Sequence, residues 1–176
     1  MKEIRFVAVP MLVLAACASQ PVDSSIPAPL VPADGKVVER IAARGVQIYE
    51  CRANATGGQG WVFVAPEAEL FDGQGRPVGK HYAGPHWEAA DGSKIVGAVK
   101  ARSDAPDASA IPWLLLDAKS VGGDGRFAKV TSVQRINTVG GLAPTTQVCD
   151  AKALGAKSRV SYTADYVLLT KSVAAY

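Results

Sequence analysis

From residue 35 onward the chain consists of short segments of strand-forming residues separated by turns rich in glycine. β-Branched and aromatic residues dominate these segments, as in Trp61-Val62-Phe63-Val64. Asp-Gly pairs mark two of the turns, at residues 72–75 and 90–92. The pattern predicts strands over residues 36–42, 46–51, 61–64, 67–71, 77–82, 85–88, 93–101, 111–118, 126–138 and 159–169.

Two of these segments need an interpretation beyond the pattern. Gly45 lies between the first two predicted strands and suits a hairpin turn that requires a positive φ. The segment 126–138 carries apolar residues spaced by three, which also suits a helix, but its β-branched residues favour a strand. Residues 151–156 are predicted to form a short turn.

Many short strands joined by tight turns are typical of an antiparallel sandwich or barrel. We therefore expect an all-β, mainly antiparallel, single-domain fold over residues 35–176, with few or no helices. The crossover helices of a doubly wound α/β fold are missing from the pattern.

The N-terminus has the features of a secretory signal peptide, predicted over residues 1–16. A basic start precedes an apolar run of 11 residues, which is shorter than the ~20 residues needed to span a bilayer as a helix. Leu14-Ala15-Ala16-Cys17 resembles the lipobox of bacterial lipoproteins, which implies a lipid on Cys17. Ordinary signal-peptidase cleavage nearby, with Cys17 incidental, is the alternative.

Residues 17–34 are predicted to form a Pro/Ser-rich tether without a core of its own. Together with the lipid, the tether predicts a domain of the cell envelope whose partner is the membrane. The lipobox resemblance, with Ala18 after the cysteine, implies sorting to the outer membrane, facing the periplasm.

The cysteines, the net charge and the absence of known motifs limit which functions are expected for this domain. With Cys17 lipidated, Cys51 and Cys149 remain, and in an oxidising compartment they are expected to form a disulfide; two separate buried thiols are the alternative. The net charge is only +3 and no basic stripe is present, so no nucleic-acid partner is expected. Hydrolase elbow, phosphate-loop and dinucleotide motifs are absent from the sequence.

The candidate chemistry centres on His81, His86 and Glu88. Imidazole and carboxylate groups bind transition metals and perform acid–base catalysis, provided that the three side chains converge. The alternative is a structural role at a turn. Arg135 is a second candidate, which either grips an anionic carboxylate or phosphate or has a structural role, pairing with Glu50 or Glu88 and satisfying loop carbonyls. Trp87 is a candidate ligand contact, whereas Trp61 and Trp113 are expected in the core.

The order of several motifs is similar to one known family. The motifs are residues 45–51, 81–88 with 91–93, 111–115, and 134–141 followed by 143–144 and Cys149. They resemble the exported bacterial and fungal family catalogued as domain of unknown function 3455, over about residues 31–169. The resemblance implies an extracytoplasmic domain with no established activity. We expect a non-enzymatic domain that binds a ligand or partner; the alternative is a metal-dependent or acid–base enzyme using His81, His86 and Glu88.

Overall fold

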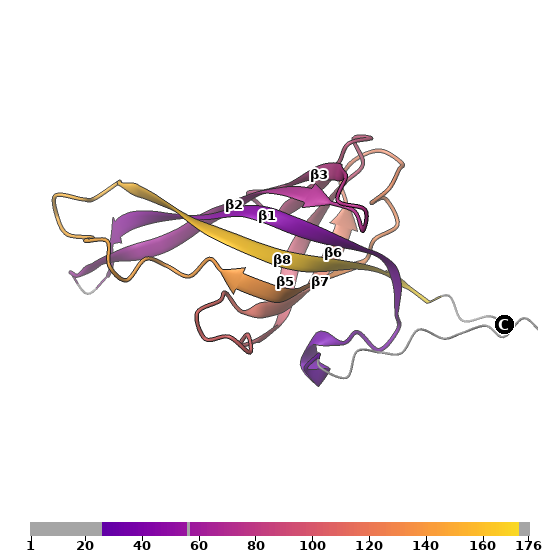
Figure 1. Cartoon of the computed structure of the whole chain (residues 1–176), viewed down its shortest axis with the longest axis horizontal. Coiled ribbons are helices and arrows are strands. Elements are labelled where there is room, and N and C mark those ends of the chain that lie inside the picture. The colour runs from indigo at the N-terminus through magenta and orange to yellow at the C-terminus, as the bar shows by residue number, and fades with distance from the viewer. Residues whose placement is uncertain (1–25, 56, 173–176) are drawn as a thin grey trace, which may run out of the picture.

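The computed structural model describes residues 26–55 and 57–172, and these residues form a closed barrel of eight antiparallel strands (Figure 1). One short 3-10 turn, η1 (Ala28–Leu30), precedes the barrel. The strands are β1 (Gly35–Ala53), β2 (Gln59–Phe71), β3 (Pro77–Tyr82), β4 (His86–Ala89), β5 (Lys94–Ser103), β6 (Trp113–Ser120), β7 (Ser132–Gly140) and β8 (Lys157–Lys171). The predicted all-β, antiparallel class is confirmed.

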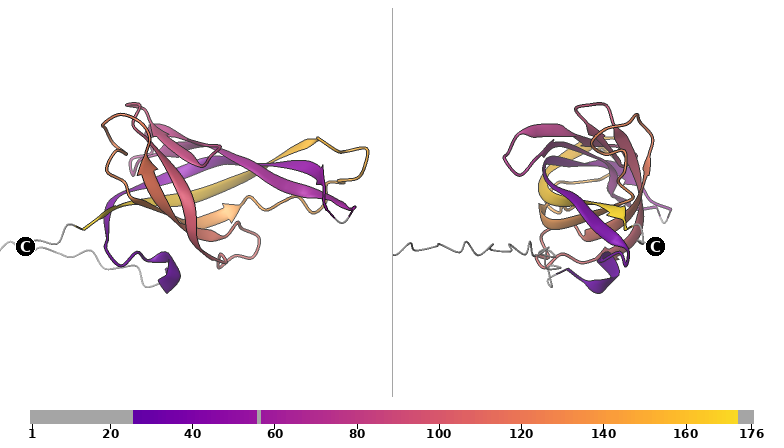
Figure 2. Two further views of the ribbon diagram at one scale, coloured as in Figure 1. Left: turned by 180° about the vertical axis from the view of Figure 1, so that it is seen from behind. Right: turned by 90° about the vertical axis from the view of Figure 1, so that its right-hand side faces the viewer.

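The strands follow one another around the barrel in sequence order, and β8 returns to pair with β1 (Figure 2). Each strand therefore has its chain neighbours as hydrogen-bonded neighbours, which is the up-and-down arrangement. The turns predicted at residues 72–75 and 90–92 connect β2 to β3 and β4 to β5. The sequence left a sandwich and a barrel as alternatives, and the structure has the barrel architecture.

The first two predicted strands are in fact one continuous strand, so the hairpin predicted at Gly45 is wrong. Gly45 lies inside β1, opposite Ala68 of β2. A Cβ at Gly45 would lie 2.1 Å from the Glu67 carbonyl oxygen and 2.5 Å from the Ala68 Cα. The glycine is therefore present because the two strands approach closely, and not because the chain turns.

A Gly45→Ala substitution is expected to destabilise the barrel by about 1–3 kcal/mol, because backbone atoms of β2 must move away from the added methyl group. Urea unfolding measures the change. Gly60→Ala is the matched control in β2, since no atom lies within 4 Å of its Cβ position. An equal loss in both variants would contradict the close-approach explanation.

Two other strand boundaries differ from the sequence prediction. Residues 61–64 and 67–71 belong to the single strand β2, which continues through Pro66. The segment predicted as a strand over 126–138 becomes strand only at Ser132. Before it, turns place Phe127 and Val130 in the core, which explains the apolar spacing of three residues.

The end of the predicted tether is part of the folded domain. Leu30 is fully buried against Trp113, Ile136 and Leu169, and its carbonyl accepts a hydrogen bond of 2.6 Å from Gln134 Nε2. The packed domain thus begins before residue 35, the expected boundary. The predicted signal peptide, the predicted lipidation site at Cys17 and the tether up to residue 25 lie outside the described residues.

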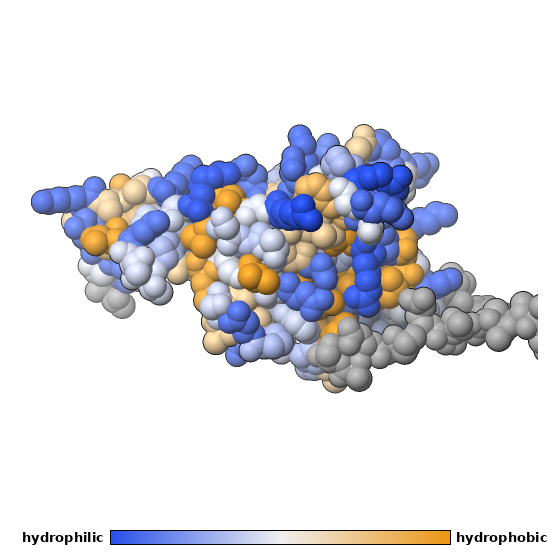
Figure 3. Space-filling view, in the orientation of Figure 1, coloured by the Kyte–Doolittle hydropathy of each residue, from blue (hydrophilic) through white to orange (hydrophobic). Residues whose placement is uncertain are grey.

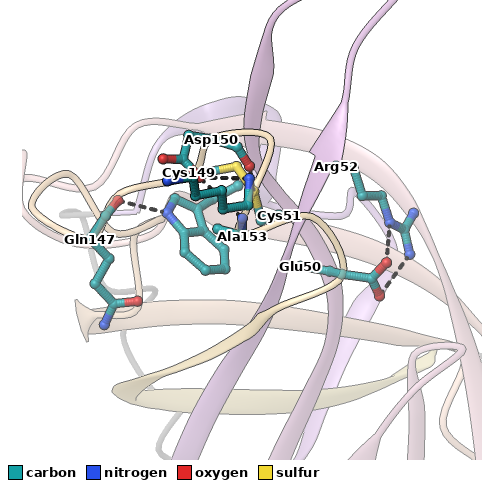
Figure 4. Close-up of a disulfide and its surroundings, with 9 residues drawn as sticks. Glu50, Cys51, Arg52, Gln147, Cys149, Asp150 and Ala153 are labelled. Carbon is teal, nitrogen blue, oxygen red and sulfur yellow. Dashed lines mark hydrogen bonds and ion pairs between the residues drawn. A yellow bond between two sulfur atoms is a disulfide. The ribbon is translucent and has the colours of Figure 1, made fainter.

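At the end of the molecule away from η1, strands β1, β2 and β8 extend past the barrel as a projecting arm (Figure 1). The predicted disulfide is confirmed there: Cys51 and Cys149 are bonded, with an S–S distance of 2.01 Å (Figure 4). The bond fastens the loop before β8 to β1. Backbone hydrogen bonds from Cys51 N to Ala156 O and from Gly155 N to Cys51 O support the same attachment.

Within the described residues, no helix is long and apolar enough to cross a bilayer.

Candidate functional site

The barrel wall is incomplete where its two shortest strands end. β2 pairs with β3 only from Ala68 to Phe71, and β4 pairs with β5 only from Lys94 to Val96. Beyond those pairs, residues 59–66 of β2 and 98–103 of β5 diverge (Figure 2), and among the described residues each of these two segments pairs with one strand only. We call the resulting gap in the wall the side opening.

A cavity of about 280 Å³ lies at the side opening. Most of its lining is apolar, with exposed Phe63 and Val99 at the surface and buried Trp87 and Tyr166 inside. The complete lining consists of Gln47, Phe63, Val64, Pro66, His81, Gly84, Pro85, Trp87, Val99, Leu114, Leu116, Arg135 and Tyr166. A concave apolar site with a few polar groups is the usual form of a small-molecule site.

Arg135 provides the positive charge in this lining. Its Nε and Nη2 donate to the Pro112 carbonyl oxygen at 3.2 and 2.9 Å. Neither expected ion-pair partner is used: Glu50 pairs with Arg52 and Glu88 pairs with Lys94. Among the described residues no carboxylate lies within ion-pair distance of Arg135, so its charge is free to meet a ligand.

Two buried hydrogen-bond donors belong to the same lining. The Gln47 Nε2 and the Trp87 Nε1 have no hydrogen-bond partner in the structure. Buried polar groups are nearly always paired, so unpaired donors beside a cavity point to a missing acceptor. Sequence reasoning identified Trp87 as a possible ligand contact but missed Gln47, whose position in a long strand carried no signal.

Hydroxyl groups form a further polar layer behind the cavity. The hydroxyls of Tyr162 and Tyr166 lie 3.4 Å apart, and Tyr49 donates to Gly141 O at 2.6 Å. Burial raises the pKa of each of these three tyrosines, against the opposing influence of Arg135. They therefore remain protonated at neutral pH, and the site gains no negative charge from them.

His81 lies inside the barrel as a neutral imidazole. It stacks on Trp87 with ring centroids 4.3 Å apart, and its Nδ1 is 2.8 Å from the His86 carbonyl oxygen. A carbonyl only accepts, so Nδ1 carries the proton and Nε2 is left as an acceptor. Burial lowers the pKa of His81 to about 3, with the Arg135 charge acting in the same direction.

The three candidate metal ligands are not brought together. His81 pairs with Trp87 across β3 and β4, whereas the adjacent pair, Tyr82 and His86, faces the other side of the sheet. His86 stacks on Tyr82, and its Nδ1 donates to Ala83 O at 2.6 Å. Glu88 accepts from the Tyr82 hydroxyl, which lowers its pKa together with the Lys94 ion pair. No cluster of three metal-binding side chains occurs in the described part of the chain.

His81 is expected to make stability depend on pH. Its folded-state pKa of about 3 lies below the ordinary value of 6.5, so the unfolded chain binds a proton that the folded chain does not. Stability is therefore complete above pH 6.5 and falls as the pH drops toward 3, by up to about 1.4 kcal/mol per pH unit. Urea unfolding at pH 7.5 and 5.5 should differ by about 1.4 kcal/mol.

Carboxyl groups add little between pH 7.5 and 5.5, because the ordinary pKa of Glu, 4.5, lies a full unit below this range and that of Asp, 3.8, lies lower still. His81→Phe keeps an aromatic ring against Trp87 and should flatten the dependence, whereas the outward-facing His86→Gln should leave it unchanged. A slope that persists in the His81→Phe variant would contradict the assignment.

The structure buries a different pair of tryptophans from the pair expected in the core. Trp113 is buried as expected, and so is Trp87, at 1% exposure. Trp61, expected in the core, is partly exposed on the arm, where its indole N–H donates to Gln147 O at 3.0 Å. Its role is to hold the loop near the disulfide.

An up-and-down barrel of eight strands with a ligand-sized cavity defines the structural class of this protein. The family model described as protein of unknown function DUF3455 matches residues 32–170, so the chain belongs to this family. No curated protein matches the chain, and no solved structure does.

Proposed function

We propose that this protein is a non-enzymatic binding domain of the cell envelope that holds a small ligand in the side opening of its barrel. The observation that carries the proposal is Arg135 in the wall of an apolar cavity, with no carboxylate partner among the described residues. The unpaired donors of Gln47 and Trp87 support it. Eight-stranded barrels are wide enough to hold one small ligand.

The features of the opening favour a small molecule over an added peptide strand. Edge strands accept peptides through free backbone donors and acceptors. In β2 that edge contains Pro66, which has no N–H, and in β5 the register shifts between Val99 and Ala101. Lys100 and Arg102 add charge along the β5 edge, a common protection against strand addition.

The envelope location rests on the sequence. The predicted signal peptide and the Cys17 lipobox support export and lipid anchoring. The Cys51–Cys149 bond fits an oxidising compartment. A lipid on Cys17 would keep the domain near the outer membrane, where apolar small molecules partition.

The proposal is tested with the neutral apolar dye N-phenyl-1-naphthylamine, which fluoresces when it leaves water. The wild-type domain should bind about one dye per chain. Leu114→Trp should weaken binding at least tenfold, because Leu114 lines the cavity and the larger side chain fills it.

Val139→Trp is the matched control, because Val139 is 60% exposed and is not part of the cavity lining. Equal binding by both variants would place the dye elsewhere, and absence of binding by the wild type would overturn the proposed function.

A further inference from the structure

We infer that the ligand of the side opening is an amphipathic monocarboxylate: a single carboxylate held by Arg135, with an elongated apolar body in the cavity. The inference rests on the proposed function and names the chemical class of its ligand.

The sign of the charge follows from the lining. Arg135 is the one charged side chain among the described residues around the cavity, since His81 is neutral. A second cavity of about 320 Å³ adjoins the first, shares Arg135 and Leu114 with it, and adds Arg102. Over the described ranges 26–55 and 57–172, no Asp or Glu lines either cavity. An anion therefore meets attraction along both cavities, whereas a cation meets only repulsion.

The geometry at Arg135 favours one carboxylate. One edge of the guanidinium, Nε and Nη2, is occupied by the Pro112 carbonyl, which fixes the plane of the group. The remaining N–H groups, which also interact with the Tyr166 hydroxyl, match the two oxygens of a planar carboxylate. Of the two cavities, Arg102 lines only the second, so in the first cavity a doubly charged phosphate would bring one negative charge more than Arg135 neutralises, and such an unpaired charge in an apolar wall is costly.

The shape of the apolar part follows from the two adjoining cavities. They share Gln47, Phe63, Val99, Leu114 and Arg135, so they are neighbours, and an elongated chain that follows the shared lining would reach from one toward the other. On the inner side Trp87 and Leu116 are buried, and toward the surface Phe63 and Val99 are exposed. Hydrocarbon placed there leaves water itself and covers the exposed Phe63 and Val99 side chains, and this removal of apolar surface from water is the source of its affinity.

The experiment measures displacement of N-phenyl-1-naphthylamine by three compounds with the same chain and different head groups: decanoate, decanol and decyltrimethylammonium. Decanoate should displace the dye at a concentration at least tenfold lower than decanol, and the cation should be the weakest. Equilibrium dialysis of decanoate gives its affinity independently of the dye.

Arg135→Met should remove the preference for decanoate over decanol while the dye still binds, which shows that the cavity is intact. Arg135→Lys should retain part of the preference because it retains the charge. Arg52→Met, which removes an exposed cation on the arm, should change nothing.

The outcomes separate the two proposals. Dye binding with equal affinity for decanoate and decanol, or a preference that survives in Arg135→Met, would overturn the carboxylate inference alone. Failure of both the dye and decanoate to bind would overturn the proposed function, and the inference with it.

Discussion

Removal of the Cys51–Cys149 disulfide is expected to lower the free energy of unfolding by about 4–5 kcal/mol. The two cysteines are 98 residues apart, so the bond closes a long loop and strongly restricts the unfolded chain. Urea unfolding of a Cys51→Ala/Cys149→Ala double variant, compared with the oxidised wild type, measures the loss.

The reduced wild type provides the control for side-chain volume, because Cys51 is buried and alanine leaves space behind. Reduced wild type and double variant should have similar stability. A loss of less than about 1 kcal/mol in both would show that the unfolded chain is restricted by something other than the bond.

Trp87→Ala is expected to cost about 3–5 kcal/mol of stability, the usual range for a large aromatic removed from a core. Trp87 is 1% exposed and contacts His81 and Tyr166 through its ring. The barrel is also shaped around the indole: a Cβ at Gly97 would lie 2.8 Å from the Trp87 ring. Thermal or urea unfolding measures the effect.

Trp87→Phe is the informative companion variant. It keeps an aromatic ring in the stack and removes the indole N–H, which has no partner in the structure. We expect a clearly smaller loss than for alanine. If phenylalanine proved as costly as alanine, the indole N–H would have to be paired in solution. Gln47 Nε2 would then be the remaining unpaired donor among the described residues of the cavity lining.

The turns were predictable from the sequence because Asp-Gly pairs act locally. The hairpins at residues 72–75 and 90–92 occur where the residue types place them. Gly45 misled the prediction because its role depends on Ala68, a residue that is distant in sequence and adjacent only after β1 and β2 pair. Glycine for a turn and glycine for a close contact look alike in one sequence.

In the candidate site, too, features set by residue type were predictable, whereas features set by contacts between distant residues were not. Arg135 and Trp87 stand out by residue type, and both line the cavity. Alternation within β4 is enough to place His86 and Glu88 on one face, but the face of His81 depends on the register between β3 and β4, which the sequence does not contain. The cavity itself arises from strand lengths, since β3 and β4 are too short to close the wall, and no single residue signals that.

The position of the disulfide also determines how the domain would respond to mechanical tension. Gly35 and Lys171 are paired neighbours, so the two ends of the barrel leave side by side. Tension between them would load the β1–β8 hydrogen bonds one pair at a time and peel the strands apart from that end. The peeling would stop at Cys51 and Cys149, beyond which the chain is covalently closed. An oxidised domain would therefore lengthen by only its two outer segments and keep β2 to β7 inside an inextensible loop.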